Sequence, residues 1–289
     1  MKLHDILTLV RPANIVTAIS DILAGMAIAG LGPPIVNAAL LIFATTGLYA
    51  GGIVFNDIFD VAEDRIDRPE RILPRALVSI RAAWILGTLL FLAGITSAFF
   101  VSALSGCLAL SIAALALLYD KISKHHPVTG PLNMGLCRGL NLLLGMSISF
   151  SAVSTHYYMG LIPVLFIAAV TLTAAGEVTG NNRASIGLAI AMDTLVVALF
   201  LVLGRYCGIS VDHSLPFLAL WYIMNGWAKI RAISDNRPQA IRIAVKTGVL
   251  SLIVLNAAYV GGFAGWMWAL PVILLLPLSL LLAKKFKVT

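Results

Sequence analysis

Charge is scarce in this sequence, and its scarcity excludes one broad class of protein. Only 11% of the 289 residues are charged, 13 of them acidic and 20 basic, whereas 60% are hydrophobic. Because a soluble domain usually has about a quarter of its residues charged, a soluble globular fold is excluded and an integral membrane protein is predicted. Cysteine is also rare. Cys107, Cys137 and Cys207 lie far apart without metal-ligand spacing and are interpreted as packing residues.

Long apolar runs recur along the chain, each close to the roughly 20 residues with which a helix crosses a bilayer. Ten such runs are predicted, at about 13–31, 35–56, 82–101, 104–119, 131–153, 159–176, 186–204, 214–230, 242–262 and 266–283. No low-complexity tract or soluble region separates them. Residues 1–289 are therefore predicted to form one all-α domain, a polytopic transmembrane bundle of nine or ten spans.

The net charge of +7 is interpreted as membrane topology and not as nucleic-acid binding. Basic residues gather in every second connection between the predicted spans, from Lys2 and Arg11 before the first to Lys284, Lys285 and Lys287 after the tenth. Lys and Arg in alternate short loops mark the cytoplasmic side of a membrane. Both termini and the second connection are thus expected on the cytoplasmic face of a multi-pass protein, in the plasma or inner membrane if the source is bacterial.

The acidic residues are concentrated in one passage, NDIFDVAEDRIDRPERILPR, at residues 56–75. On a helix that continues past the second span, Asn56, Asp60 and Asp64 recur every four residues and share one face. Asp57 lies on an adjoining stripe. Stacked carboxylates repel one another unless a cation lies among them, and oxygen ligands suit Mg²⁺, which takes substrate phosphates as further partners. The passage predicts a Mg²⁺ site for a polyphosphate.

A solvated loop is the alternative interpretation, since Arg65 and Arg68 are placed to neutralise neighbouring acids. The order of the residues favours a site, because Asn-Asp-x-x-Asp-x-x-x-Asp is followed by Arg68-Pro69-x-Arg71 and then by Pro74-Arg75. This long pattern resembles the first aspartate-rich motif of the UbiA superfamily of intramembrane prenyltransferases. Weaker similarities fall in the family's order: Arg11-Pro12-Ala13-Asn14 at the first span, and Tyr119 with Lys121 or Lys124 at the end of the fourth.

The resemblance implies an enzyme that binds an isoprenoid diphosphate at the cytoplasmic mouth of the bundle, with the prenyl tail in an apolar cavity. Mg²⁺ would neutralise the diphosphate and assist its departure, and a hydrophobic acceptor would capture the allylic cation. Positive charge must be in position before the C–O bond breaks, because the site is poorly hydrated. Basic side chains beside the motif are expected to donate to phosphate oxygens. For each of them, a purely topological loop charge is the alternative.

A second acidic motif is expected after the sixth span, where the family usually has two aspartates. This chain has Glu177 and Asn181 there, at the i, i+4 spacing. An amide oxygen coordinates Mg²⁺ without contributing charge, so a second metal is expected to bind more loosely or not at all. Two interpretations stay open, a catalyst with an altered second site and a protein that binds isoprenoid diphosphates without turning them over.

Several polar residues fall inside apolar runs, where an ionised group is costly. Asp21 and Asp193 are expected to line a cavity or to be satisfied by each other or by nearby hydroxyls. Arg138 and Asn141 are interpreted either as cavity lining or as helix-to-helix hydrogen bonds. The candidate catalytic residues are Asp60 and Asp64. The candidate metal ligands are Asn56, Asp60, Asp64, Glu177 and Asn181, and the candidate substrate-binding residues are Arg11, Asn14, Asp57, Arg68, Arg71, Tyr119, Lys121, Arg138 and Asn141.

The function predicted from the sequence is Mg²⁺-dependent prenyl transfer from an isoprenoid diphosphate to an aromatic or lipidic acceptor. The expected partners are this diphosphate, the acceptor and the lipid bilayer, with no nucleic acid. A non-catalytic binder or carrier of the same fold is one alternative. A ten-span small-molecule transporter is another, although such carriers place polar residues near the membrane midplane, whereas here they collect at one face.

Overall fold

The computed structural model describes residues 3–30, 32 and 34–286, which contain helices and no β-strand. The helices are α1 (Leu3–Val10), α2 (Pro12–Ala29), α3 (Ile35–Phe59), α4 (Val61–Asp67), α5 (Ile80–Val101), α6 (Ala103–Leu118), η1 (Tyr119–Ser123), α7 (Thr129–Met146), α8 (Phe150–His156), η2 (Tyr157–Gly160), α9 (Leu161–Ala174), α10 (Arg183–Tyr206), α11 (Val211–Asp235), α12 (Pro238–Ala264), α13 (Trp266–Ile273) and α14 (Leu275–Lys285). Lys2 and Lys287, which enter the prediction of topology, lie outside the described residues.

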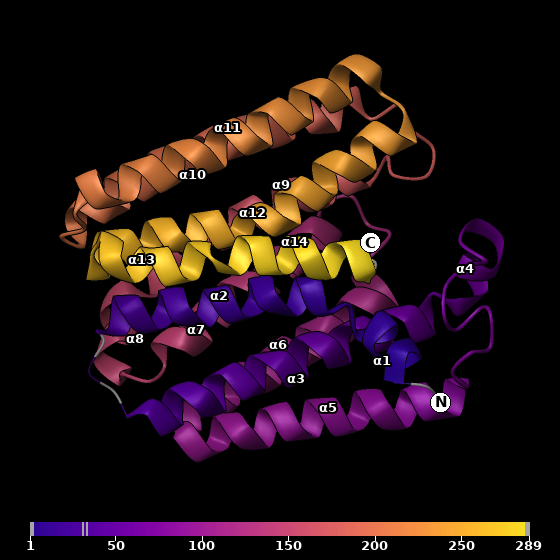
Figure 1. Cartoon of the computed structure of the whole chain (residues 1–289), viewed down its shortest axis with the longest axis horizontal. Helices are drawn as coiled ribbons and strands as arrows, with labels where there is room; N and C mark the ends of the chain where they lie inside the picture. Colours follow the sequence, from indigo (N-terminus) through magenta and orange to yellow (C-terminus); the bar gives the residue numbers. More distant parts are fainter. Residues whose placement is uncertain (1–2, 31, 33, 287–289) are drawn as a thin grey trace.

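Each of the ten predicted runs overlaps a helical segment, although the run at 131–153 covers α7 and part of α8, and α8 belongs with α9 to one candidate span. Among the described residues, eight segments are long and apolar enough to cross a membrane. The other two are α7, with 18 residues, and α11, with 25. These two carry the buried charges Arg138 and Lys229. The long helices lie side by side along the longest axis of the molecule (Figure 1). The predicted all-α membrane bundle is therefore confirmed.

Two hydrophobic cores divide the bundle. One is formed chiefly by α9, α10, α11 and α12, and the other by α3, α5 and α6. Helices α2 and α7 contribute to both: Ala24 and Met146 belong to the first core, whereas Ile22 and Leu144 belong to the second. These two helices consequently join the halves of the bundle.

Glycine lets α3 and α5 approach closely. A Cβ atom at Gly47 would lie 2.6 Å from the carbonyl oxygen of Leu90 and 3.2 Å from the Cα of Gly94. A side chain does not fit there without moving the backbone, as in other membrane helix pairs that meet through small residues. The crossing fixes the direction of α3, whose last turn carries Asn56.

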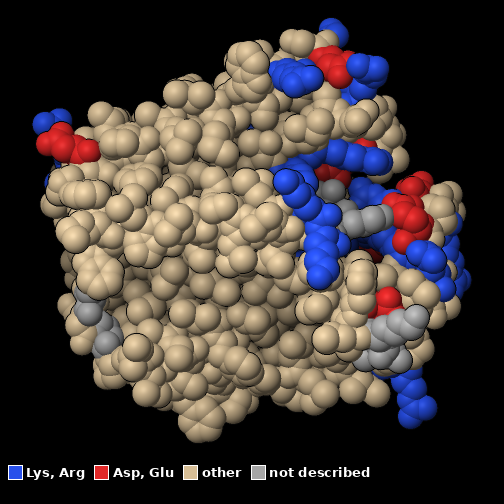
Figure 2. Space-filling model, viewed as in Figure 1, with Lys and Arg blue, Asp and Glu red and all other residues tan. Residues whose placement is uncertain are grey.

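Charged side chains gather at one end of the bundle, which we call the charged end. Figure 2 shows Lys, Arg, Asp and Glu crowded there, whereas most of the visible surface is uncharged apart from a small group at the opposite end. The charged end contains α1 and α4, and the last turn of α14 (Figure 1). The acidic passage, η1 and the 175–182 connection also belong to it, as their mutual contacts show below. The site is built from these segments.

Candidate functional site

Two side-chain contacts join the end of α3 to η1. Asn56 Nδ2 donates a hydrogen bond to Asp120 Oδ1 at 2.8 Å, and Lys124 Nζ donates to Asp60 Oδ2. Asn56 and Asp60 are four residues apart at the end of α3, and Asp120 and Lys124 are four residues apart in and after η1. The two contacts therefore lie about one helical turn apart. The sequence analysis did not identify Asp120. Its position directly after Tyr119, at the end of a span, was the available signal.

The local backbone explains why these residues meet. Helix α3 ends at Phe59, but the backbone N–H of Asp64 still donates to the Asp60 carbonyl at 2.8 Å, so the helical turn continues into α4. The segment η1 is a π-helix in which the Lys124 N–H donates to the Tyr119 carbonyl at 2.9 Å, one residue further back than in an α-helix. Such wide turns are frequent at functional sites. Here the wide turn ends α6 with both Asp120 and Lys124 in contact with α3 or its C-cap.

Two arginines hold the remaining aspartates of the motif. Arg11, which precedes α2, lies 2.5 Å from Asp57 Oδ1 through Nη2. Arg71 Nη1 lies 2.7 Å from Asp64 Oδ2 and 3.5 Å from Asp57 Oδ1, so it bridges two carboxylates. Arg71 reaches them because the chain reverses after α4 through turns, with the Arg71 N–H donating to the Arg68 carbonyl at 3.0 Å. The Arg-Pro-rich segment therefore folds back over the motif that precedes it.

Glu177 brings the 175–182 connection to the same place. Arg68 Nη2 lies 3.2 Å from Glu177 Oε2, and Arg242 Nε donates to the Glu177 backbone carbonyl at 3.1 Å. Burial raises the pKa of Glu177 above its ordinary value, and the nearby Arg68 and Arg242 oppose that increase. The glutamate is 7% exposed. The first and second motifs, far apart in the sequence, are thus joined by one ion pair.

Two of the predicted site residues that stay outside this cluster are exposed. Lys121 is exposed on η1, and Lys124 takes the contact with the motif instead. Asn181 is also exposed, and its side-chain oxygen accepts a hydrogen bond from Asn236 at 3.2 Å. The expected helical spacing of Glu177 and Asn181 is wrong, because residues 175–179 form turns and Asn181 has a φ of 57°. The remaining candidates Asn14, buried in the first turn of α2, and Tyr119, half-buried in η1, lie near the charged end of their helices.

Arg138 and Asn141 belong to a different, deeper network. Arg138 Nη1 donates to Asp21 Oδ2 at 2.6 Å, and Asn141 Nδ2 donates to the same oxygen at 2.9 Å. Asn256 Nδ2 donates to Asp21 Oδ1 at 2.7 Å. Asp21 is ten residues beyond Arg11, about 15 Å along a helix. The structure therefore favours helix-to-helix hydrogen bonding for these residues, and Asp21 is satisfied by α7 and α12 and not by Asp193.

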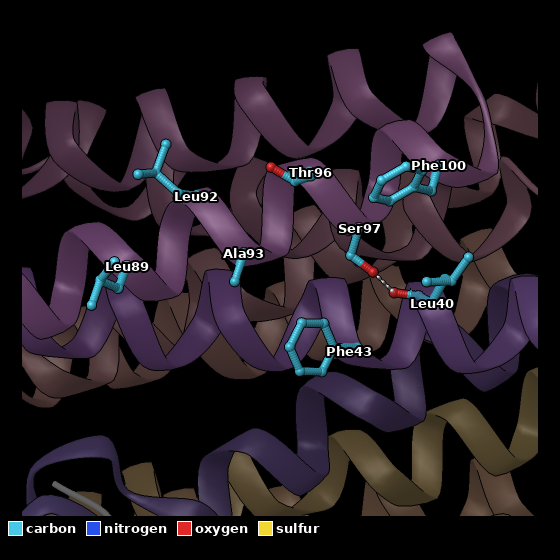
Figure 3. A pocket seen from close by; sticks show the side chains of 8 residues that line it. All are labelled: Leu40, Phe43, Leu89, Leu92, Ala93, Thr96, Ser97 and Phe100. Carbon is cyan, nitrogen blue, oxygen red and sulfur yellow. Dashed lines mark hydrogen bonds between the residues drawn. The ribbon is translucent and has the colours of Figure 1, made fainter.

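The open groove in Figure 3 is not the apolar chamber expected below the motif. It lies between α3 and α5 and is lined by Leu40, Phe43, Leu89, Leu92, Ala93, Thr96, Ser97 and Phe100. Phe100 is 74% exposed, so the groove is on the outer surface. Leu40 precedes Asp60 by 20 residues, about 30 Å of helix. The groove therefore lies far from the charged cluster.

The donors of the cluster suit Mg²⁺ chemically. Asp57, Asp60, Asp64, Asp120 and Glu177 are each between 5% and 9% exposed and supply hard oxygen ligands. Among the described residues, however, no three His, Cys, Asp or Glu side chains are arranged to hold a metal ion. Each carboxylate instead contacts a basic group or, for Asp120, an amide. The cluster fits Mg²⁺ if these contacts are exchanged when the ion enters with an anionic substrate.

Comparison with known proteins identifies the class. The model of the UbiA prenyltransferase family matches residues 18–242. The digeranylgeranylglyceryl phosphate synthase of Methanosarcina mazei is 32% identical over 146 residues, which are 50% of this chain and 48% of that protein. The synthase of Methanoculleus marisnigri is 33% identical over 278 residues, 86% of this chain and 94% of that protein. The chain belongs to the UbiA prenyltransferase family.

Solved structures agree on the fold. A UbiA homologue from Aeropyrum pernix has a TM-score of 0.70 at 18% identity, covering 84% of this chain and 96% of that chain. A UbiA homologue from Archaeoglobus fulgidus bound to GPP and Mg²⁺ has a TM-score of 0.69 at 13% identity, covering 93% and 99%. The predicted family and fold are both confirmed. The chain spans about half the length of the M. mazei relative, against nearly all of the M. marisnigri one.

Proposed function

We propose that this protein transfers a prenyl group from an isoprenoid diphosphate to a hydrophobic acceptor within the membrane, with Mg²⁺ as cofactor. The observation that carries the proposal is the interleaving of buried acids and bases at the charged end. Asp57, Asp60, Asp64 and Glu177 are each ion-paired there. A Mg²⁺–diphosphate carries the same two kinds of charge, so each group of the protein finds a partner of opposite sign in it. The family membership supports the same function.

Binding is an exchange of partners. In the structure, Arg71 neutralises Asp64, and Lys124 neutralises Asp60. When the diphosphate enters, these cations donate to its oxygens, and the carboxylates of Asp60 and Asp64, with the amide oxygen of Asn56, hold the metal. The bound Mg²⁺ supplies Lewis-acid neutralisation of the diphosphate. Arg11 and Arg68 pair with Asp57 and Glu177 and hold these two side chains in place beside it.

The reaction breaks one C–O bond and forms another. The bond between C1 of the prenyl group and the diphosphate breaks, and its electron pair leaves with pyrophosphate. The hydroxyl oxygen of the acceptor bonds to C1, and its proton passes to the released pyrophosphate. Arg71 and Lys124 stabilise the charge that develops on the leaving group, because their ion pairs hold them among buried carboxylates before the diphosphate binds.

The acceptor that we propose is a prenylated glyceryl phosphate. The support is that relatives bear the name digeranylgeranylglyceryl phosphate synthase. Arg242, which donates to the Glu177 backbone carbonyl, and Lys246, one turn further along α12, add positive charge to the part of α12 that reaches this connection. An acceptor phosphate would be attracted to them. A neutral aromatic acceptor would not use these charges.

The test is turnover of the purified protein in detergent. Geranylgeranyl diphosphate, geranylgeranylglyceryl phosphate and Mg²⁺ are expected to give a diprenylated product, and Asp60→Ala to abolish it. Asp67→Ala is the matched control, because Asp67 belongs to the same passage but is exposed. Tight binding of the diphosphate without product in any acceptor mixture would favour the non-catalytic alternative. Solute flux across vesicles without a diphosphate requirement would favour the transporter.

A further inference from the structure

Asp120 is a buried acid that the proposed reaction does not yet use. It is 9% exposed, and its Oδ1 accepts the hydrogen bond from Asn56 Nδ2 at 2.8 Å. It lies in the wide turn of η1, four residues before the lysine that contacts Asp60. A buried carboxylate is costly in an apolar bundle unless it is hydrogen-bonded. Its hydrogen bond to Asn56, an expected metal ligand, indicates a specific role.

The role of Asp120 follows from the direction of its hydrogen bond with the Asn56 amide. Asn56 Nδ2 is the donor and Asp120 Oδ1 the acceptor of this hydrogen bond, so the group that Asn56 turns toward Asp120 is its NH₂. The amide is planar, and fixing the nitrogen on one side fixes Oδ1 on the other. Mg²⁺ binds the amide oxygen and not the amide nitrogen. A freely rotating amide would present the wrong atom for part of the time.

We propose that Asp120 is a positioning residue that locks the Asn56 amide with its oxygen toward the metal. This inference rests on the proposed function, because it needs a divalent ion at Asn56. Groups of this kind, which orient a ligand without touching the metal, typically change metal affinity by about 10- to 100-fold when removed. Asp120 acts through Asn56 alone, and this distinguishes it from a further metal ligand.

The experiment compares Asp120→Ala in two backgrounds and measures ion binding directly. Mn²⁺ binding to the purified protein, in detergent with inorganic pyrophosphate, is followed by electron paramagnetic resonance. In the wild-type background, Asp120→Ala is expected to weaken Mn²⁺ binding by about tenfold. In the Asn56→Asp background it should not weaken binding, because a carboxylate presents an oxygen in either orientation. Removing Asp120 there also removes a repulsion between two acids.

Each outcome of the Mn²⁺ measurements either supports or overturns the positioning role of Asp120. Weakening by Asp120→Ala in both backgrounds would identify Asp120 as a metal ligand and overturn the positioning role. Unchanged binding in both backgrounds would overturn it as well. Asp67→Ala, an exposed acid in the same passage, controls for loss of negative charge. A thermal unfolding midpoint close to that of the parent shows that the variant is folded.

Failure of the proposed function is recognised from the wild-type protein and not from the Asp120 variants. Wild-type protein that binds no Mn²⁺ would overturn the metal site and the positioning role together. Wild-type protein that binds Mn²⁺ but forms no prenylated product would overturn catalysis only, and the comparison of the two backgrounds would still decide the role of Asp120.

Discussion

Lys229 and Asp193 form an ion pair, with 2.6 Å between Nζ and Oδ2, inside the core made by α9 to α12. Both side chains are 1% exposed, and the ammonium lies 5.8 Å from the centre of the Phe166 ring. The pair joins α10 to α11. Such a pair need not stabilise the protein relative to apolar residues, but either charge left alone is costly.

We therefore expect Asp193→Ala to destabilise the protein by about 3–5 kcal/mol, because it leaves the Lys229 ammonium buried without a counter-charge. The double variant Asp193→Leu with Lys229→Met should be close to the parent in stability. Unfolding midpoints in detergent measure both. A double variant as unstable as Asp193→Ala would show that the charges themselves hold the helices together. Asp212→Ala, at an exposed position early in α11, is the control.

Arg71→Ala should impair use of the isoprenoid diphosphate, since Arg71 bridges Asp57 and Asp64 in the structure. A fall in kcat/KM of about 100-fold, or about 2.7 kcal/mol, is expected for loss of a buried charged contact to the leaving group. Arg75→Ala tests the same chemistry at an exposed position four residues along. Equal losses in the two variants would mean that the loop acts only through its overall charge.

Lys124 and Lys121 are expected to contribute differently to turnover. Lys124, the residue that follows η1, contacts Asp60, whereas Lys121 is exposed within η1. Steady-state assays should show a loss of about tenfold or more for Lys124→Ala, because it removes a charge-assisted contact worth roughly 1.5–3 kcal/mol. Lys121→Ala should behave like the parent. The reverse order would contradict the assignment of Lys124 to the site.

Metal dependence should centre on Glu177 and not on Asn181. Chelation of divalent ions is expected to stop turnover, and added Mg²⁺ to restore it. Glu177→Gln removes a buried charge that holds Arg68, so the Mg²⁺ concentration for half-maximal rate should rise by about tenfold. Asn181→Ala should leave that concentration unchanged, because Asn181 is exposed and contacts Asn236. A larger effect for Asn181 would restore it as a metal ligand.

The fold and the first motif could be predicted because each depends on residues that are close together in the sequence. Apolar runs of span length have few alternatives to membrane helices, and the repeat of Asn56, Asp60 and Asp64 follows from one helix. The structure retains the i to i+4 backbone bonds through Asp60 and Asp64. The contacts of Asn56 and Asp60 were not predictable, because Asp120 and Lys124 come from another segment, and Arg71 reaches Asp64 only because the chain reverses after α4.

Two features of the site depend on backbone detail that composition does not reveal. The π-turn at η1 brings Lys124 against Asp60 and Asp120 against Asn56, and it leaves Lys121 exposed. The turns after Glu177 end at Gly180 and Asn181, which both have a positive φ, and they separate two residues that a helix would have placed together. The π-turn has no comparable sequence signal, whereas the glycine at position 180 is the usual mark of a positive φ.

The network around Asp21 has a consequence for biogenesis. Asp21 lies in the first predicted span, yet the arginine that neutralises it comes 117 residues later, and the asparagine on its other oxygen 235 residues later. At translation rates of about 5–20 residues per second, the first of these partners emerges on the order of ten seconds after Asp21. During that interval the span has to wait in or beside the insertion machinery with an unsatisfied acid. Helix α2 is therefore the first predicted span to be made, but the hydrogen bonds of Asp21 are complete only when α12 arrives.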